Sequence, residues 1–185
     1  MILRVMNTVP QKKNRLIKRL RYLWTFELFD SLFLPAVALF SARRLEQVVG
    51  LLTLYGAGLV AWLLWQGAAY WWLKLRAVRR DSVVSAAHLR WFALLKRVNW
   101  ILIGLLPVLV AVRSAVGLGV PSTFDGIAGL ALYGLAVLEQ INYYHYQLMY
   151  DYPPDWRWLV ENRRLKRSSL SRALRAQDVG GATGA

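Results

Sequence analysis

Four long apolar stretches follow one another along the chain, and each is long enough to form a membrane-spanning helix. A helix of about 20 apolar residues crosses the hydrocarbon core of a bilayer. Pro35 and Pro107 lie inside two of the stretches and predict kinks there, because proline removes a helix hydrogen bond. The pattern predicts an all-α integral membrane protein with four transmembrane helices. We place these spans at about residues 22–42, 48–73, 98–117 and 124–150.

The segments outside the spans are basic and amphipathic. Residues 1–21 form a basic leader, and residues 74–97 predict a loop and a helix that lead into the third span. Residues 153–176 predict a further basic amphipathic helix, whereas residues 177–185 are expected to be disordered. Helices of this kind lie on a membrane surface or contact a partner helix. We therefore expect one transmembrane bundle over residues 22–152, with basic interfacial helices on a single side of the membrane.

The distribution of positive charge predicts the orientation of the bundle. The chain has 24 Lys and Arg against 10 Asp and Glu, which gives a net charge of +14. Seven of the basic residues lie in residues 1–21, seven in 74–97 and seven in 157–175. Because Lys and Arg concentrate on the cytoplasmic side of membrane spans, we expect both termini in the cytoplasm. In a soluble protein such a charge would suggest nucleic acid, but here it flanks apolar spans and indicates anionic lipid head groups.

Two further features narrow the class of protein. The chain contains no cysteine, which excludes disulfides, thiol catalysis and thiolate metal sites. Glu27 and Asp30 interrupt the first apolar stretch, so the beginning of the chain does not have the pattern of a cleaved signal peptide. The lack of cysteine and of large outer loops fits a bacterial inner membrane.

Polar side chains within the spans form the candidate functional site. An ionisable group in hydrocarbon costs about 2.5–3.5 kcal/mol on insertion scales, so its presence is a functional hypothesis by default. Glu139, Asn142 and Tyr146 share one face of the fourth span. His145 lies at the edge of this face, which we expect to meet the acidic residues of the first span. The predicted intramembrane polar layer, in the cytoplasmic half of the spans, consists of Glu27, Asp30, Gln66, Glu139, Asn142, His145 and Tyr146.

Three interpretations of this layer stay open. It can be a buried hydrogen-bond network, in which His145 or a basic residue of the inner loop neutralises a carboxylate. A transporter or channel would use Glu27, Asp30 and Glu139 as a cation or proton site. A lipid-modifying enzyme would use His145 as an acid or base beside Glu139. We expect no metal or other cofactor, because Asn142 stands where a di-iron carboxylate bundle needs histidine.

The basic run after the fourth span is the candidate binding surface. It can attract anionic lipid, or it can bind a partner under the control of phosphorylation at Ser168 or Ser169. Its candidate lipid- or partner-binding residues are Arg163, Arg164, Lys166, Arg167, Arg172 and Arg175. We favour a non-enzymatic membrane subunit that anchors or organises a protein partner or anionic lipids at the cytoplasmic face, as a monomer or homo-oligomer. An oligomeric transporter or channel is the second hypothesis, and a lipid-modifying enzyme is the third.

Overall fold

A computed structural model of the chain describes residues 8–117, 121–150 and 153–182. These residues form six α-helices and no strand. Four of the helices are long and apolar enough to cross a membrane. The prediction of an all-α protein with four helices able to span a membrane is therefore confirmed. The helices are α2 (Thr8–Arg44), α3 (Leu51–Arg79), α4 (Ala86–Ala115), α5 (Thr123–Tyr144), α6 (Pro153–Asn162) and α7 (Ser169–Ala182).

α3 is the central helix of the bundle. It packs extensively against α2 and α5, while α4 contacts α3 and α5 over a shorter length. Within the most apolar part of each helix, 56% of the residues of α3 are buried, against 11% in α2 and 17% in α4. The exposed faces of α2 and α4 carry many large apolar side chains, as expected of surfaces that contact lipid.

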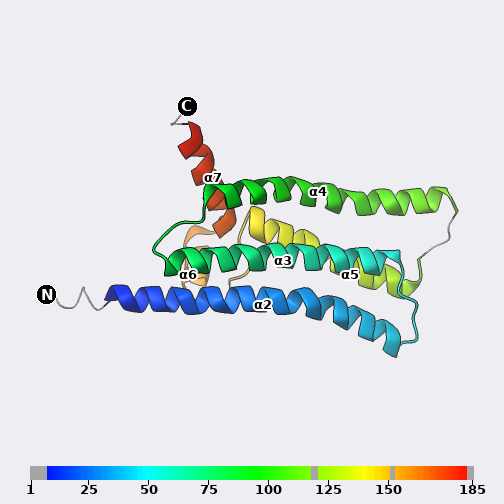
Figure 1. Cartoon of the computed structure of the whole chain (residues 1–185). Coiled ribbons are helices and arrows are strands. Elements are labelled where there is room, and N and C mark those ends of the chain that lie inside the picture. Colours follow the sequence, from blue (N-terminus) through cyan, green and yellow to red (C-terminus); the bar gives the residue numbers. More distant parts are fainter. Residues whose placement is uncertain (1–7, 118–120, 151–152, 183–185) are drawn as a thin grey trace.

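Successive long helices run in opposite directions, as Figure 1 shows. The start of α2, the α3–α4 turn and α7 therefore lie at one end of the bundle, and the α2–α3 and α4–α5 connections lie at the other. The described residues of the three basic blocks gather at the first of these ends, which we call the basic end. The opposite end is called the far end.

α3 and α5 approach each other closely at two glycines. A Cβ atom at Gly129 would lie 2.6 Å from the carbonyl carbon of Leu52. A Cβ atom at Gly56 would lie 2.9 Å from the carbonyl oxygen of Gly129. Because backbone atoms cannot move aside cheaply, both positions need a residue without a side chain. Small residues at such crossings let helices pack through direct backbone contact in a membrane.

α5 is shorter than the fourth span that the sequence predicts. It ends at Tyr144, although the apolar pattern predicts a span that reaches residue 150. The chain then turns and pairs with the segment that precedes α7. The Gln147 N–H donates to the Lys166 carbonyl at 2.8 Å, and the Ser168 N–H donates to the His145 carbonyl at 3.2 Å. These partners are distant in sequence, so the periodicity within the span does not reveal where the helix ends.

The predicted basic helix over residues 153–176 is interrupted. α6 ends at Asn162, and Arg163 adopts a left-handed backbone conformation with a φ of 48°. This conformation cannot continue a right-handed helix, so α7 follows as a separate element. α7 extends through residues 177–182, which belong to the tail that the sequence predicts to be disordered. Residues 183–185, the rest of that predicted tail, lie outside the described part of the chain.

α7 is packed against the bundle through its apolar face. Leu170 and Leu174 are buried in a cluster with Tyr70, Phe92 and Tyr144. The helix contacts α4 and α5, and Figure 1 shows it crossing the end of the bundle. The basic segment at the C-terminal side is therefore part of the folded body rather than a free arm.

The basic leader and the first span form one continuous helix. α2 has 37 residues, which corresponds to a length of about 55 Å. Figure 1 shows α2 straight through the leader and bent towards the far end, in the half that contains Pro35. The leader thus extends the axis of the span instead of turning away from it. α4 likewise runs from Ala86 into the third span without a break.

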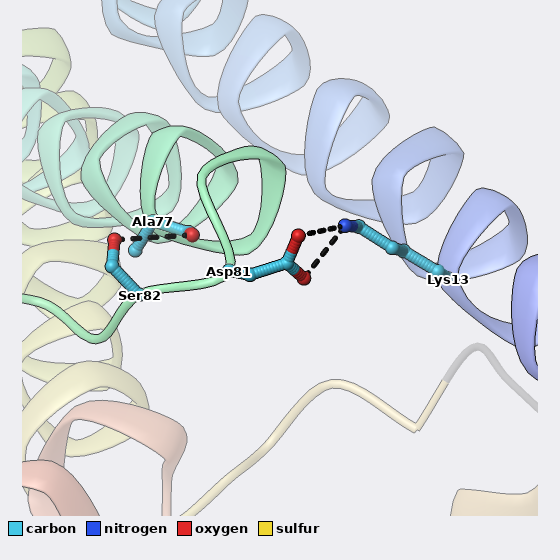
Figure 2. A network of polar contacts seen from close by, with 4 residues as sticks. All are labelled: Lys13, Ala77, Asp81 and Ser82. Atoms are coloured by element: carbon cyan, nitrogen blue, oxygen red, sulfur yellow. Dashed lines mark hydrogen bonds and ion pairs between the residues drawn. The ribbon is translucent and has the colours of Figure 1, made fainter.

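One ion pair attaches the leader to the α3–α4 turn. Lys13 Nζ lies 2.7 Å from each carboxylate oxygen of Asp81, as Figure 2 shows. Asp81 has a left-handed conformation with a φ of 49°, just after α3 ends. The neighbouring Ser82 hydroxyl donates to the Ala77 carbonyl at 3.3 Å and holds the same turn.

Lys13→Gln is expected to change the free energy of unfolding by less than about 1 kcal/mol, because exposed ion pairs contribute little. The Lys13 side chain is 36% exposed and the Asp81 side chain 79%. Thermal unfolding in mild detergent measures the change, with Lys12→Gln as the control for loss of one positive charge. A loss for Lys13→Gln that exceeds the control by more than about 2 kcal/mol would contradict this small contribution.

Candidate functional site

A network of neutral side chains, which we call the amide network, joins α3, α4 and α5. Asn99 is fully buried, and its side-chain nitrogen donates to Gln66 at 2.9 Å and to Gln140 at 3.0 Å. Its side-chain oxygen accepts hydrogen bonds from Gln66 at 3.0 Å and from Trp62 at 3.1 Å. The Tyr144 hydroxyl completes the network by donating to Gln66 at 2.7 Å.

The amide network has the properties of a structural element. None of its members carries a charge, and Gln140 uses its amide nitrogen to donate to the Lys96 carbonyl at 3.2 Å. Polar groups buried in hydrocarbon need such partners. Of its members, only Gln66 belongs to the predicted polar layer. Asn99 and Gln140 are also polar residues within the predicted spans, and that signal could have identified them.

A second group of polar residues, which we call the carboxyl cluster, joins α2 and α5 around Tyr143. The Tyr143 hydroxyl donates to the buried Glu27 carboxyl. Glu139 lies close enough for its charge to interact with those of Glu27 and Asp30. It also accepts a hydrogen bond from Asn142 at 3.2 Å. The structure therefore brings together four residues of the predicted layer and adds Tyr143.

Tyr143 is the member of the carboxyl cluster that the predicted layer lacks. A Cβ atom at Gly67 would overlap the Tyr143 ring, so glycine at this position of α3 makes room for the ring. Tyr143 is buried and lies four residues after Glu139, on the same helical face. That spacing was the signal that could have found it.

His145 and Tyr146 lie away from the carboxyl cluster. His145 follows α5 with φ −129° and ψ −76°, leaves the predicted helical face and packs edge-on against Trp100 at 5.9 Å. The charged group that acts on the imidazole is the basic Lys96 rather than a carboxylate. Tyr146 lies beside Arg167, whose guanidinium carbon is 6.0 Å from the ring centre. His145 is thus not in a position to neutralise a carboxylate of the layer.

The chemistry that this arrangement allows is limited. The described residues contain no group of three or more His, Asp or Glu that could hold a metal ion. His145 and Glu139 do not form the acid–base pair that an enzyme centred on them would need. The carboxyl cluster can hold or exchange a proton among Glu27, Tyr143 and Glu139, through the hydrogen bond and the interacting charges described.

Basic side chains from all three blocks line two cavities at the basic end. A smaller cavity of about 160 Å³ lies between α2, α3 and α7, and its basic lining residues are Arg19, Lys74, Lys166 and Arg172. A larger cavity of about 610 Å³ is lined by the basic residues Arg90, Lys96, Arg97, Arg167 and Arg175. Four of the six predicted lipid- or partner-binding residues thus line a cavity. The other two, Arg163 and Arg164, are exposed on the connection between α6 and α7.

Ser168 and Ser169 are held inside the basic end. Ser168 is 4% exposed, and its hydroxyl donates to the Tyr143 carbonyl. The Ser169 hydroxyl hydrogen-bonds to the Tyr70 hydroxyl at 2.9 Å and accepts a hydrogen bond from Lys74. Because a kinase needs an accessible hydroxyl, this geometry does not support a phosphorylation switch at these serines in the folded chain.

Comparisons with known proteins returned no match: no protein-family model, no curated protein and no solved structure corresponds to the chain. The functional proposal therefore rests on the geometry of the amide network, the carboxyl cluster and the basic end.

Proposed function

We propose that the chain is a non-enzymatic membrane subunit that binds and organises anionic lipids at the cytoplasmic face. The observation that carries the proposal is the gathering of three basic blocks, distant in sequence, at one end of the bundle. Because the chain has 24 Lys and Arg against 10 Asp and Glu, acidic side chains cannot balance all of this charge. A positive surface at the level of the head groups attracts anionic lipids.

The proposal orients the bundle with its basic end in the cytoplasm. Lys and Arg are enriched on the cytoplasmic side of membrane spans. Among the described residues, the basic residues of the far end are Arg43, Arg44 and Arg113. The three basic blocks, whose described residues lie at the other end, contain seven basic residues each. Both termini then lie on the cytoplasmic side, an orientation that suits the inner membrane of a bacterium.

The expected strength of lipid binding follows from the number of exposed basic residues. Each Lys or Arg close to an anionic membrane surface contributes about 1 kcal/mol. Arg163, Arg164, Arg167, Arg172 and Arg175 are exposed. α7 is packed against the bundle, so the basic residues on α7 and on the segment before it are held at defined positions. Two such residues together contribute about 2 kcal/mol. This free energy corresponds to roughly a 30-fold preference for an anionic over a neutral lipid at a single site.

The two alternative functions have less support. The enzyme hypothesis needs His145 beside Glu139, and the two residues lie in different surroundings. The transporter hypothesis needs a polar route from the carboxyl cluster to the far end. An apolar core that includes Val60, Leu63 and Ala136 lies along that route. We therefore assign the carboxyl cluster a structural role.

Lipid preference can be measured through quenching of tryptophan fluorescence by brominated lipids in reconstituted vesicles. The chain has 9 tryptophans, and Trp71, Trp72 and Trp91 lie towards the basic end. At equal mole fraction, we expect brominated phosphatidylglycerol to associate about threefold or more strongly than brominated phosphatidylcholine. The preference should fall as the salt concentration rises to about 0.5 M, because salt screens exposed charges.

Neutralising the C-terminal basic residues supplies the decisive comparison. We expect most of the preference to be lost when one variant carries glutamine at Arg163, Arg164, Lys166, Arg167, Arg172 and Arg175. The double variant Glu27→Gln/Glu139→Gln alters only the carboxyl cluster and is expected to keep the preference. Equal association of the two lipids with the unmodified protein would contradict the proposal.

A further inference from the structure

The smaller cavity at the basic end has the chemistry of a phosphate-binding site. Its volume of about 160 Å³ is bounded by α2, α3, α7 and the end of α5. This volume accommodates roughly ten water-sized groups, which is enough for a phosphate and the carbons attached to it. Its lining combines four basic side chains, two serines and two tyrosines with apolar side chains of α2, and the basic members include Lys74 and Arg172.

Lys74 lines this cavity and has no acidic partner among the described residues. Its ammonium group donates to the Ser169 hydroxyl and lies 5.9 Å from the Tyr70 ring centre and 5.5 Å from that of Trp71. No carboxylate of the described residues lies within ion-pair distance of Lys74. A half-buried ammonium group thus has one hydroxyl and two aromatic rings in place of its lost water.

Two further cations act on Lys74. The charges of Arg172 and Arg19 both interact with its ammonium group. Like charges that share a partly desolvated cavity repel one another, and an anion bound among them relieves the repulsion. Lysine and arginine also bind phosphate through strong, charge-assisted hydrogen bonds. The electrostatics of the cavity therefore favour a bound anion.

Glu27 does not supply the missing negative charge. It lines the same cavity, but its carboxyl receives the Tyr143 hydroxyl and interacts electrostatically with Glu139. The cavity consequently has an acidic side towards the membrane core and a basic side at Lys74. This division confines an anionic group to the basic side.

We propose that the cavity binds the phosphate group of a phosphate ester between Lys74 and Arg172, with an apolar chain lying against α2. Leu16, Leu20 and Leu23 form the apolar wall that such a chain would contact. A phospholipid head group and a soluble phosphate ester share the phosphate chemistry, and a lipid also uses this wall. This site specifies which group the proposed function binds, and it rests on that function. A phosphate of a membrane lipid reaches the cavity only when the basic end lies at the level of the head groups.

Native mass spectrometry of the full chain in mild detergent tests the site with two probes. Monoacyl phosphatidic acid offers a phosphate and an apolar chain, whereas glycerol 3-phosphate offers the phosphate alone. We expect a saturable one-to-one complex with the monoacyl probe, weakened at least about tenfold in Lys74→Gln and in Arg172→Gln. Competition by glycerol 3-phosphate would identify the phosphate as sufficient, and binding of the acylated probe alone would identify a lipid ligand. The absence of a saturable complex with either probe overturns the proposal.

Arg76→Gln is the matched control for Lys74→Gln. Arg76 lies two residues further along α3, is exposed and does not line the cavity. Its replacement removes the same charge and is expected to change the affinity by less than about twofold, because solvent screens an exposed charge. Lys74→Arg should stay within about threefold of the unmodified protein, which separates loss of charge from loss of fold.

The two proposals fail in distinguishable ways. If Arg76→Gln weakens binding as much as Lys74→Gln does, the cavity is not a specific phosphate site. The proposed function is then tested only by the lipid preference measured in vesicles. If glycerol 3-phosphate binds saturably through Lys74 while the vesicles show no preference for anionic lipid, the cavity is a phosphate site and the proposed function is wrong.

Discussion

Asp125→Ala is expected to lower the free energy of unfolding by about 2–4 kcal/mol, since it removes a charged helix cap from a buried position. The Asp125 carboxylate accepts hydrogen bonds from the Thr53 N–H and the Thr53 hydroxyl, each at 2.8 Å. This N–H belongs to the first turn of α3, whose N-cap residue Gly50 has no side chain to offer. Asp125 is 4% exposed, so water cannot take the place of the carboxylate.

Equilibrium unfolding in mixed detergent, followed by circular dichroism, measures this loss. Asp125→Asn keeps an acceptor oxygen and is expected to lose about half as much stability as Asp125→Ala. Glu46→Gln removes an exposed acidic charge from the same end of the bundle and should cost less than about 0.5 kcal/mol. Similar losses for Asp125→Ala and Glu46→Gln would show that the cap contributes nothing.

Asn99→Leu is expected to lower the free energy of unfolding by about 2–3 kcal/mol. It removes four side-chain hydrogen bonds, and interhelical hydrogen bonds in membranes contribute about 0.6 kcal/mol each on average. It also leaves the buried amides of Gln66 and Gln140 without these partners, which adds a desolvation cost. α4 depends on this residue, because its other buried residues are few: Leu89, Phe92, Ile103 and Leu106.

A double-mutant cycle tests whether Asn99 acts through the amide network. Asn99→Leu and Gln66→Leu disrupt two of the same hydrogen bonds, so the double variant should lose less stability than the sum of the single losses. Ser114→Ala, which removes only a local hydrogen bond to the Val110 carbonyl on the exposed side of α4, serves as the control and should be nearly neutral. Strictly additive losses for Asn99 and Gln66 would rule out the network as the cause.

The candidate site could be predicted where it depends on spacing within one helix. Glu27 and Asp30 share a face of α2, and Glu139 and Asn142 share a face of α5, as helical periodicity predicts. The positions of these residues relative to each other follow from the need to turn polar groups away from lipid. His145 departs from the prediction because α5 ends before it.

The cavity at the basic end, in contrast, could not be predicted from spacing within one helix. Composition identifies which residues are basic, but the cavity at Lys74 and Arg172 needs α7 to return to the bundle. That return depends on the left-handed turn at Arg163 and on the burial of Leu170 and Leu174. An amphipathic pattern indicates that α7 buries its leucines, but not whether lipid, a partner or the bundle itself covers them.

The sequence by itself determined the four helices that are long and apolar enough to span a membrane, and the uneven distribution of charge. Both are additive properties of neighbouring residues, because a helix crosses the hydrocarbon core when about 20 consecutive residues are predominantly apolar. Only the tertiary structure decided where α5 ends, how α7 closes the basic end and that Asp125 caps α3. Each of these features is a contact between residues far apart in the chain, and such contacts exist only after the helices have packed.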